Sequence, residues 1–193
     1  MTDNKSILIV GVGGQGTLLA SRILGKALTS LDYDVKVSEV HGMSQRGGSV
    51  ETYVKYGEKV FSPIIKEGEA DIILSFELLE AARYLPFLKI GGKVIVNTQK
   101  IDPMSVVTGK AEYPSLLEEK IIAKGAELTC VDALALAKQA GSVKAVNIVL
   151  IGVMASHSEI EKQVWLDAVV STVPEKFREL NIKAFELGYG SAK

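Results

Sequence analysis

The segment that decides the fold reads Ile7-Leu8-Ile9-Val10-Gly11-Val12-Gly13-Gly14-Gln15-Gly16-Thr17. Four apolar residues precede a glycine-rich turn, and a helical pattern with apolar residues three and four apart follows over 17–28. Strand, glycine loop and helix in this order let backbone N–H groups and a helix N-terminus face a phosphate or another anion. The segment therefore predicts an α/β fold with an anion-binding edge.

Strand and helix patterns alternate along the rest of the chain. Strands are predicted over 34–40, 49–56, 71–75, 93–97 and 127–131, and helices over 77–85, 115–124, 132–140, 145–156 and 174–188. This alternation predicts a Rossmann-like open, mostly parallel sheet with helices on both faces and a helical C-terminal portion. Ligands gather at the carboxyl ends of the strands in such sheets. We expect residues 1–193 to form a single domain.

Several local features refine this outline. The segment 58–62 can pair with 49–56 as a hairpin, Gly91-Gly92 is expected to be a turn, and 103–114 to be an irregular connection. Helix starts are predicted from two capping boxes, from an Asp N-cap and from a Pro at the first helical position: Ser115 with Glu118, Ser158 with Glu161, Asp132, and Pro174.

The side chains expected in the core come from two sources. Trp165 and Cys130 are expected there because of their apolar surroundings. In the last helix one apolar stripe is expected to pack on the sheet, with two aromatic residues beside it free to meet a partner. The stripe is Phe177, Leu180, Ala184 and Leu187, and the aromatic pair is Phe185 and Tyr189.

The composition indicates which partners and which cellular location to expect. The 193 residues are 47% hydrophobic and carry a formal net charge of −1, with no basic stripe, so no nucleic-acid partner is expected. The longest apolar stretch, 145–155, is broken by Asn147 and is shorter than the roughly 20 residues that span a bilayer. The N-terminal segment 1–6 is polar after Met1 and does not resemble a signal peptide. A cytoplasmic protein without a membrane partner is expected.

The numbers of cysteines and histidines bear on disulfides, iron–sulfur clusters and metal sites. Cys130 is the single cysteine, so no internal disulfide can form. An iron–sulfur cluster needs about four cysteine ligands, more than this chain has. The two histidines, His41 and His157, lie far apart in the sequence and in no metal-ligand spacing. We expect no metal site in this chain.

The first glycine loop allows several interpretations. The spacing Gly11-x-Gly13-x-x-Gly16 is shared with proteins that bind NAD(P) or FAD, and Glu39 lies 23 residues after Gly16, near where such folds place a ribose-binding carboxylate. The same glycines also suit a tight turn without a ligand. Gly14 and Gln15 make the loop richer than the minimal Gly-x-Gly-x-x-Gly motif, which favours a bound anion or a partner backbone that approaches closely. The loop alone leaves these alternatives open.

A second loop follows the strand predicted over 34–40. It reads His41-Gly42-Met43-Ser44-Gln45-Arg46-Gly47-Gly48. Its polar donors can hold a phosphate or carboxylate, Arg46 by a bidentate contact, although a solvated loop has the same composition. In a dinucleotide-binding fold this region would cover the adenosine, where no such loop is needed. The candidate ligand-binding residues are Gly11, Gly13, Gly14, Gln15, Gly16, His41, Ser44, Gln45, Arg46, Gly47 and Gly48.

The two loops together resemble the gamma-type domain of the 2-oxoacid:ferredoxin oxidoreductase family. The octapeptide 41–48 is the most specific element, and it resembles the indolepyruvate type of small (beta) subunit more than the pyruvate or 2-oxoglutarate types. The resemblance extends over nearly the whole chain, through 11–16, 38–50, 68–71, 91–98, Asn147, 174–177 and 181–188.

The resemblance implies an accessory subunit. The family decarboxylates a 2-oxo acid on thiamine diphosphate, passes electrons through iron–sulfur clusters to ferredoxin and transfers the acyl group to coenzyme A. With one cysteine and no Gly-Asp-Gly motif, this chain is expected to leave thiamine diphosphate, Mg and 4Fe–4S clusters to a large alpha subunit. Alone it is expected to bind no cofactor, supply no catalytic residue and be inactive.

The resemblance also places the two glycine loops near the coenzyme A side of the family's enzymes. Ferredoxin is expected to act through the assembled complex. Two alternatives remain: a gamma subunit of a pyruvate- or 2-oxoglutarate-specific relative, and a free-standing NAD(P)-binding oxidoreductase.

Overall fold

A mixed sheet forms the centre of the chain in the computed structural model, which describes residues 4–41 and 47–191. Among these residues the sheet has six strands in the order β2-β3-β1-β4-β5-β6. β1, β4, β5 and β6 are parallel, and β3 runs antiparallel to both β1 and β2. The predicted fold class is therefore confirmed. The strands are β1 (Lys5–Val12), β2 (Asp34–His41), β3 (Ser49–Gly57), β4 (Ala70–Ser75), β5 (Leu88–Asn97) and β6 (Glu127–Val131).

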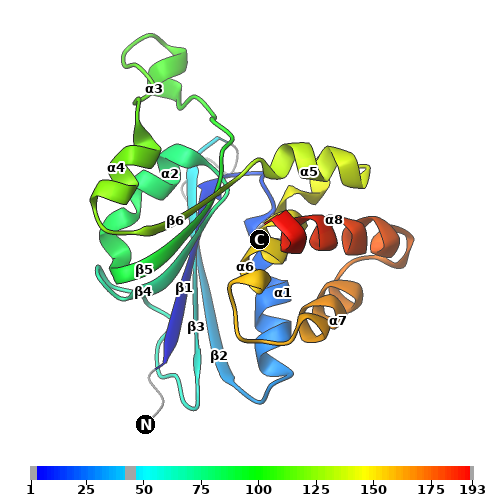
Figure 1. The fold of residues 1–193 in the computed structure, drawn as a ribbon. Helices are drawn as coiled ribbons and strands as arrows, with labels where there is room; N and C mark the ends of the chain where they lie inside the picture. Colours follow the sequence, from blue (N-terminus) through cyan, green and yellow to red (C-terminus); the bar gives the residue numbers. More distant parts are fainter. Residues whose placement is uncertain (1–3, 42–46, 192–193) are drawn as a thin grey trace.

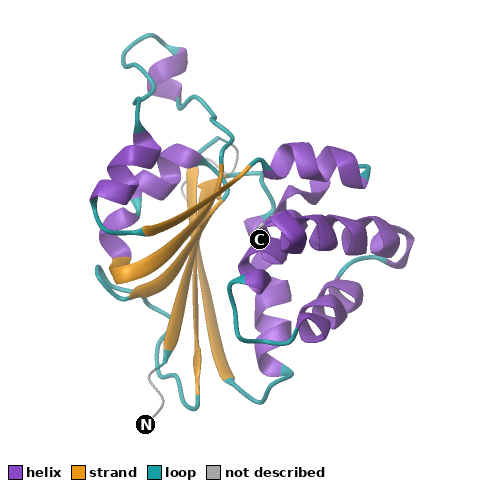
Figure 2. Cartoon of the chain, viewed as in Figure 1, coloured by secondary structure: helices purple, strands orange, loops and turns teal. Residues whose placement is uncertain are grey.

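Helices cover both faces of the sheet (Figures 1 and 2). α2 (Leu78–Arg83) and α4 (Leu117–Ala123) lie on one face. A thicker helical layer lies on the other: α1 (Thr17–Thr29), α5 (Ala133–Ala140), α6 (Val146–Ser156), α7 (Lys162–Thr172) and α8 (Arg178–Ser191). The short helix α3 is Met104–Val107, and three 3₁₀ turns, η1, η2 and η3, span Leu85–Phe87, Val143–Ala145 and Glu175–Phe177. None of the described helices is long and apolar enough to cross a membrane.

The two deepest elements follow directly from their sequences. The apolar run 7–10 lies in β1, which has neighbours on both sides and helices over both faces, so these four side chains are at most 3% exposed. α6 is apolar nearly all round, with Asn147 as a polar exception, and its residues 146–155 are all buried, as predicted. Asp132 caps α5, because its Oδ1 accepts a hydrogen bond from Ala135 N at 2.9 Å.

Five local predictions are wrong. The segment 58–62 forms no strand; β3 instead pairs on its two sides with β1 and β2. Gly91 and Gly92 lie inside β5, where the register shifts against β4, and not in a turn. Neither capping box forms: α4 follows a left-handed Leu116, and Glu161, without a side-chain hydrogen bond, precedes α7. Pro174 precedes η3, so α8 begins only at Arg178.

Three predictions about burial are also wrong. Cys130 is exposed, because β6 is an edge strand of the described sheet. Phe185 is fully buried and Tyr189 is half-buried, whereas Phe177 of the predicted stripe is exposed. Trp165 is buried as predicted, and its Nε1 donates to Ser158 Oγ at 3.2 Å.

Phe185 is buried because α8 packs directly against α6. The two helices approach closely at two glycines: a Cβ at Gly152 would collide with the Phe185 carbonyl oxygen, and a Cβ at Gly188 with the Val149 carbonyl oxygen. The α8 face that carries Phe185 is therefore turned inward, and a helix pattern that assumes packing on the sheet alone assigns the faces incorrectly.

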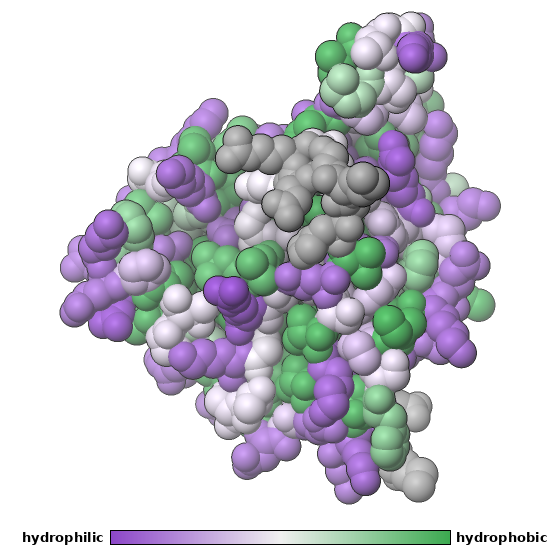
Figure 3. Space-filling view, turned by 180° about the vertical axis from the view of Figure 1, so that it is seen from behind, coloured by the Kyte–Doolittle hydropathy of each residue, from purple (hydrophilic) through white to green (hydrophobic). Residues whose placement is uncertain are grey.

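The connection between β5 and α4 projects from the body. We call residues 98–116 the arm. It leaves the carboxyl end of β5, carries α3 near its tip and stands clear of the sheet and the other helices (Figures 1 and 3). Residues 103–114 of the arm were predicted to be irregular, which holds apart from the single turn of α3.

Candidate functional site

The first glycine loop lies at the carboxyl edge of the sheet, between β1 and α1. Gly14 and Gly16 have φ angles of 100° and 87°, which side chains other than glycine rarely adopt. Gly16 is the N-cap of α1 and supplies no side-chain hydrogen bond. The N–H groups of Thr17 and Leu18 have no intrahelical acceptor, and no hydrogen bond joins them to another described residue. The loop thus presents backbone donors at a helix N-terminus, as predicted.

The Gln15 side chain points into the protein. Its Oε1 accepts a hydrogen bond from Val12 N at 2.7 Å, and its Nε2 donates to the Phe76 carbonyl at 3.0 Å. A Cβ at Gly11 would lie 2.8 Å from this Oε1 and 2.9 Å from the Cβ of Phe76. Gly11 therefore makes room for the inward Gln15 amide, and the loop offers a ligand its backbone rather than this side chain.

Two buried asparagines hold the loop from behind. Asn147 of α6 donates from Nδ2 to the Gly16 carbonyl at 3.3 Å, and a Cβ at Gly16 would lie 2.8 Å from that nitrogen. Asn97, at the end of β5, donates to the Phe76 carbonyl at 3.1 Å and accepts from Ala133 N at 3.1 Å. Asn97 thus links the end of β5 to the residue after β4 and to the start of α5, and Asn147 links α6 to the N-cap of α1.

The second loop joins β2 to β3 and meets the first. The Gly13 N–H donates to the Gly48 carbonyl at 2.8 Å, and Gly47 has a φ of 76°. The structure therefore brings Gly13 and Gly48 together at the edge predicted from the sequence. Of the other predicted residues, His41 is the last residue of β2, and Ser44, Gln45 and Arg46 lie outside the described residues.

The sheet order separates this edge from a dinucleotide-binding site. In such sites the strand that carries the ribose-binding carboxylate lies next to the strand that precedes the glycine loop. Here the antiparallel β3 lies between β1 and β2, so Glu39 is one strand further away. Ser21 Oγ of α1 donates to Glu39 at 3.3 Å. Spacing along the sequence suggested a ribose contact, but the topology does not support it.

A buried acidic cluster lies beside the loops and was missed by the sequence analysis. Ser49, which is in register with Val12, donates through Oγ to Glu80, and Tyr84 Oη lies 3.3 Å from the same Oγ. Burial raises the pKa of the Glu80 carboxyl and of the Tyr84 phenol. A detectable signal was present: Glu80 follows the buried strand β4 within an apolar stretch, where a carboxylate needs partners.

Glu77 forms the inner part of this cluster and is 1% exposed. Its Oε2 accepts from Glu80 N at 2.9 Å and caps α2. Its Oε1 accepts from Ile101 N at 3.0 Å and from Tyr113 Oη at 2.6 Å. One buried carboxylate thus fixes both ends of the arm next to the glycine loops.

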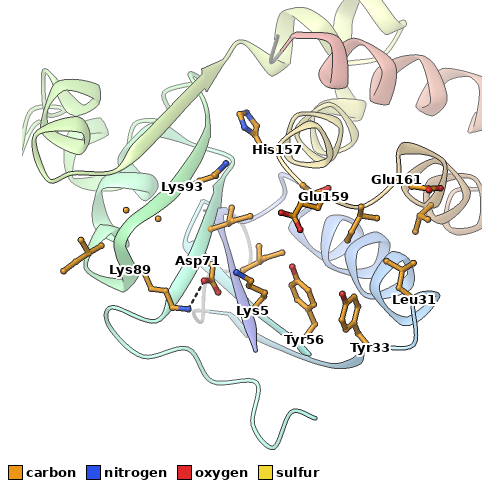
Figure 4. Close-up of a pocket in the computed structure, with 18 residues that line it drawn as sticks. Lys5, Leu31, Tyr33, Tyr56, Asp71, Lys89, Lys93, His157, Glu159 and Glu161 are labelled. Carbon is orange, nitrogen blue, oxygen red and sulfur yellow. Dashed lines mark hydrogen bonds and ion pairs between the residues drawn. The ribbon is translucent and has the colours of Figure 1, made fainter. Parts of the chain in front are cut away.

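A cavity of about 900 Å³ lies at the opposite, amino-terminal edge of the sheet (Figure 4). Lys89 and Asp71 form an ion pair at 2.7 Å on one side of it, and Lys93 points toward His157. Burial and the nearby Lys93 hold the pKa of His157 below its usual value. The lining holds three lysines and three carboxylates (Lys5, Lys89, Lys93, Asp71, Glu159 and Glu161), so it favours no single ligand charge. The sequence analysis did not find it.

The described residues contain no group of three or more His, Cys, Asp or Glu side chains that could hold a metal ion. The partners of the carboxylates in the acidic cluster are hydroxyl and backbone N–H donors and the Arg83 guanidinium, whose Nε lies 3.3 Å from Glu80 Oε1.

Comparison with known proteins gives a consistent family assignment. The family model described as "Pyruvate ferredoxin/flavodoxin oxidoreductase" matches residues 6–191. The chain is 45% identical over 194 residues to a protein named "Indolepyruvate oxidoreductase subunit IorB" from Thermococcus kodakarensis, with 97% of this chain and 96% of the relative covered. It is 28% identical to a "2-oxoglutarate synthase subunit KorC" from Methanocaldococcus jannaschii, with 98% and 94% covered.

Solved structures share the fold. The gamma subunit of a keto/oxoacid ferredoxin oxidoreductase from Geobacter sulfurreducens is 28% identical, with a TM-score of 0.73 and coverage of 97% of this chain and 98% of that chain. A 2-oxoglutarate:ferredoxin oxidoreductase from Magnetococcus marinus matches at 16% identity with a TM-score of 0.75, covering 100% of this chain and 31% of that chain. The second likeness concerns the fold alone.

Proposed function

Because the chain belongs to the pyruvate ferredoxin/flavodoxin oxidoreductase family, we propose that it is the gamma-type small subunit of an indolepyruvate ferredoxin oxidoreductase. The observation that carries this proposal is the 45% identity over nearly the whole length of an IorB relative, compared with 28% to a 2-oxoglutarate relative. The assembled enzyme would oxidatively decarboxylate an aryl pyruvate, form the acyl thioester of coenzyme A and pass two electrons to ferredoxin.

In this proposal the redox chemistry lies on a large alpha subunit. Thiamine diphosphate, Mg and 4Fe–4S clusters would be bound there, because one exposed cysteine cannot ligate a cluster and no described acidic or histidine group fits a metal. The isolated chain would therefore be inactive. Residues 1–193 would act as one gamma-type domain in the cytoplasm, and ferredoxin would react with the complex.

The contribution of this chain would be to hold an anionic group at its carboxyl edge. The N–H groups at the start of α1, without a side-chain cap, and the predicted Arg46 guanidinium are the donors we assign to a phosphate of coenzyme A. The inward Gln15, Asn97 and Asn147 amides would hold the loop in place. Bound coenzyme A would supply the thiol that accepts the acyl group.

The proposal is tested by co-expressing the chain with its large subunit and purifying the complex through a tag on this chain. We expect a brown complex that reduces ferredoxin with indolepyruvate and coenzyme A, and that is faster with indolepyruvate than with pyruvate or 2-oxoglutarate. The isolated chain should be colourless, without absorbance near about 400 nm after iron–sulfur reconstitution. A coloured or active isolated chain, or a complex that prefers 2-oxoglutarate, contradicts the proposal.

A further inference from the structure

The arm exposes apolar side chains at a distance from the body. Met104, Val107 and Leu116 are 69%, 65% and 64% exposed, and the knob that the arm forms stands clear in the space-filling view (Figure 3). Isolated exposed apolar residues are common on protein surfaces. Ile101, Val106 and Tyr113 of the arm are half-buried, but a projection that exposes three large apolar side chains is the kind of surface that another protein covers.

The tip of the arm has a fixed local structure. Val106 N and Val107 N both donate to the Pro103 carbonyl, at 2.8 and 3.0 Å. Lys110 N and Ala111 N both donate to the Ser105 carbonyl, at 2.8 and 3.1 Å. These bonds close a compact turn around α3, on which Met104 and Val107 are three residues apart and so lie on the same side.

The base of the arm is fixed as well. Ile101 and Tyr113, near its two ends, both bind Glu77 Oε1, and Leu78 N donates to the Gln99 carbonyl at 3.2 Å. Glu77 follows directly from the carboxyl end of β4, the strand beside β1. The arm is therefore held in a defined position at the same edge of the sheet as the two glycine loops.

We propose that the arm is a docking element whose Met104 and Val107 side chains enter an apolar recess of the large subunit. This inference rests on the proposed function. The arm and the glycine loops share one edge, so a large chain that reaches the loops also reaches the arm. The charged side chains of the arm balance, Lys100 and Lys110 against Asp102 and Glu112, which does not suit a polyanionic partner.

A second copy of this chain fits less well as the occupant. A stable protein–protein interface buries about 1,200–2,000 Å² in total. One turn of helix with two apolar side chains cannot supply that area alone. As an extension of a larger contact along the carboxyl edge, it adds two buried apolar anchors to an interface of sufficient size.

The test compares two double variants of the full chain. M104S/V107S changes the arm, and I90S/I122S removes two exposed isoleucines outside the arm, in β5 and on α4. Each purified chain is titrated against the separately purified large subunit by biolayer interferometry. Thermal unfolding of each isolated chain is recorded in parallel, and sedimentation velocity reports self-association.

We expect M104S/V107S to weaken binding of the large subunit about 100-fold, since each truncated anchor costs roughly tenfold. I90S/I122S should bind like the wild type, and all three chains should unfold at similar temperatures. Wild-type affinity in M104S/V107S, equal losses in both variants, or a change in self-association alone would overturn the inference. If the wild-type chain itself fails to bind the large subunit, the proposed function fails first.

Discussion

Replacing Gly16 by Ala tests the link between the glycine loop and α6. At a φ of 87° the substitution costs about 1–2 kcal/mol for a left-handed backbone. The added Cβ would also lie 2.8 Å from Asn147 Nδ2, and displacing that amide strains a buried contact at a cost of about 1–3 kcal/mol. We expect Gly16→Ala to lower the free energy of unfolding by about 2–5 kcal/mol.

Gly14 provides the matched control. Its φ is 100°, but nothing lies within 4 Å of the position that a Cβ would take, so Gly14→Ala carries the backbone cost of about 1–2 kcal/mol alone. The difference between the two variants isolates the contact with Asn147. Urea unfolding followed by circular dichroism measures both, provided that the m-value stays constant.

A double-mutant cycle makes the test stricter. Asn147→Ala removes the amide that the methyl group introduced by Gly16→Ala would strike. The double variant should therefore be about 1–2 kcal/mol more stable than the sum of the single losses predicts. If Gly16→Ala costs no more than Gly14→Ala, or if the cycle is additive, Asn147 does not hold the loop in the way that the structure indicates.

Four further outcomes are expected. Arg46→Ala should raise the KM for coenzyme A or the Kd for the large subunit about 10- to 150-fold, with little change in thermal stability. The control Arg178→Ala, on α8, should change neither constant. A lower melting temperature with intact activity would show that Arg46 is structural. The pKa of Glu80 is raised in the folded state above its ordinary value of 4.5, so the stability that its protonated form contributes is lost as pH rises through the folded-state pKa. Glu80→Gln should therefore flatten the fall in the free energy of unfolding above pH 4.5. An unchanged pH profile of urea unfolding would contradict this. Gly188→Ala should destabilise the chain by about 1–3 kcal/mol through the Val149 carbonyl, while Gly190→Ala, with open space around it, should not; equal effects would remove the packing argument. Calorimetry should find NAD(H) binding weaker than about 10 μM, and tighter binding would restore the dehydrogenase interpretation.

The sequence was sufficient for features that depend on local pattern. The apolar run in β1, the almost entirely apolar α6 and the Asp132 cap each need only neighbouring residues, and each forms as predicted. The meeting of the two glycine loops at one edge also follows from strands that point the same way. Periodicity does not report strand direction, so the antiparallel insertion of β3 could not be read from it.

The errors come from contacts between distant residues. Phe185 is buried because α8 packs on α6 through glycines, an arrangement that a single helix pattern does not contain. The acceptor of the Gln15 amide, the Phe76 carbonyl, lies 61 residues away, so the sequence does not indicate that this side chain points inward. Cys130 is exposed because β6 ends the described sheet, and strand order is a property of the whole fold.

The position of Glu77 also bears on how such a chain can diverge. Because Ile101 and Tyr113 meet at one carboxylate oxygen, the base of the arm is closed without any contribution from the peptide between them. Loop tips of this kind tolerate insertions and even new termini. Selection for stability therefore acts on the residues at the base of the arm, while selection for a different partner can change the residues at its tip. One fold could in this way acquire different partner preferences through changes in a few residues that its own core never contacts.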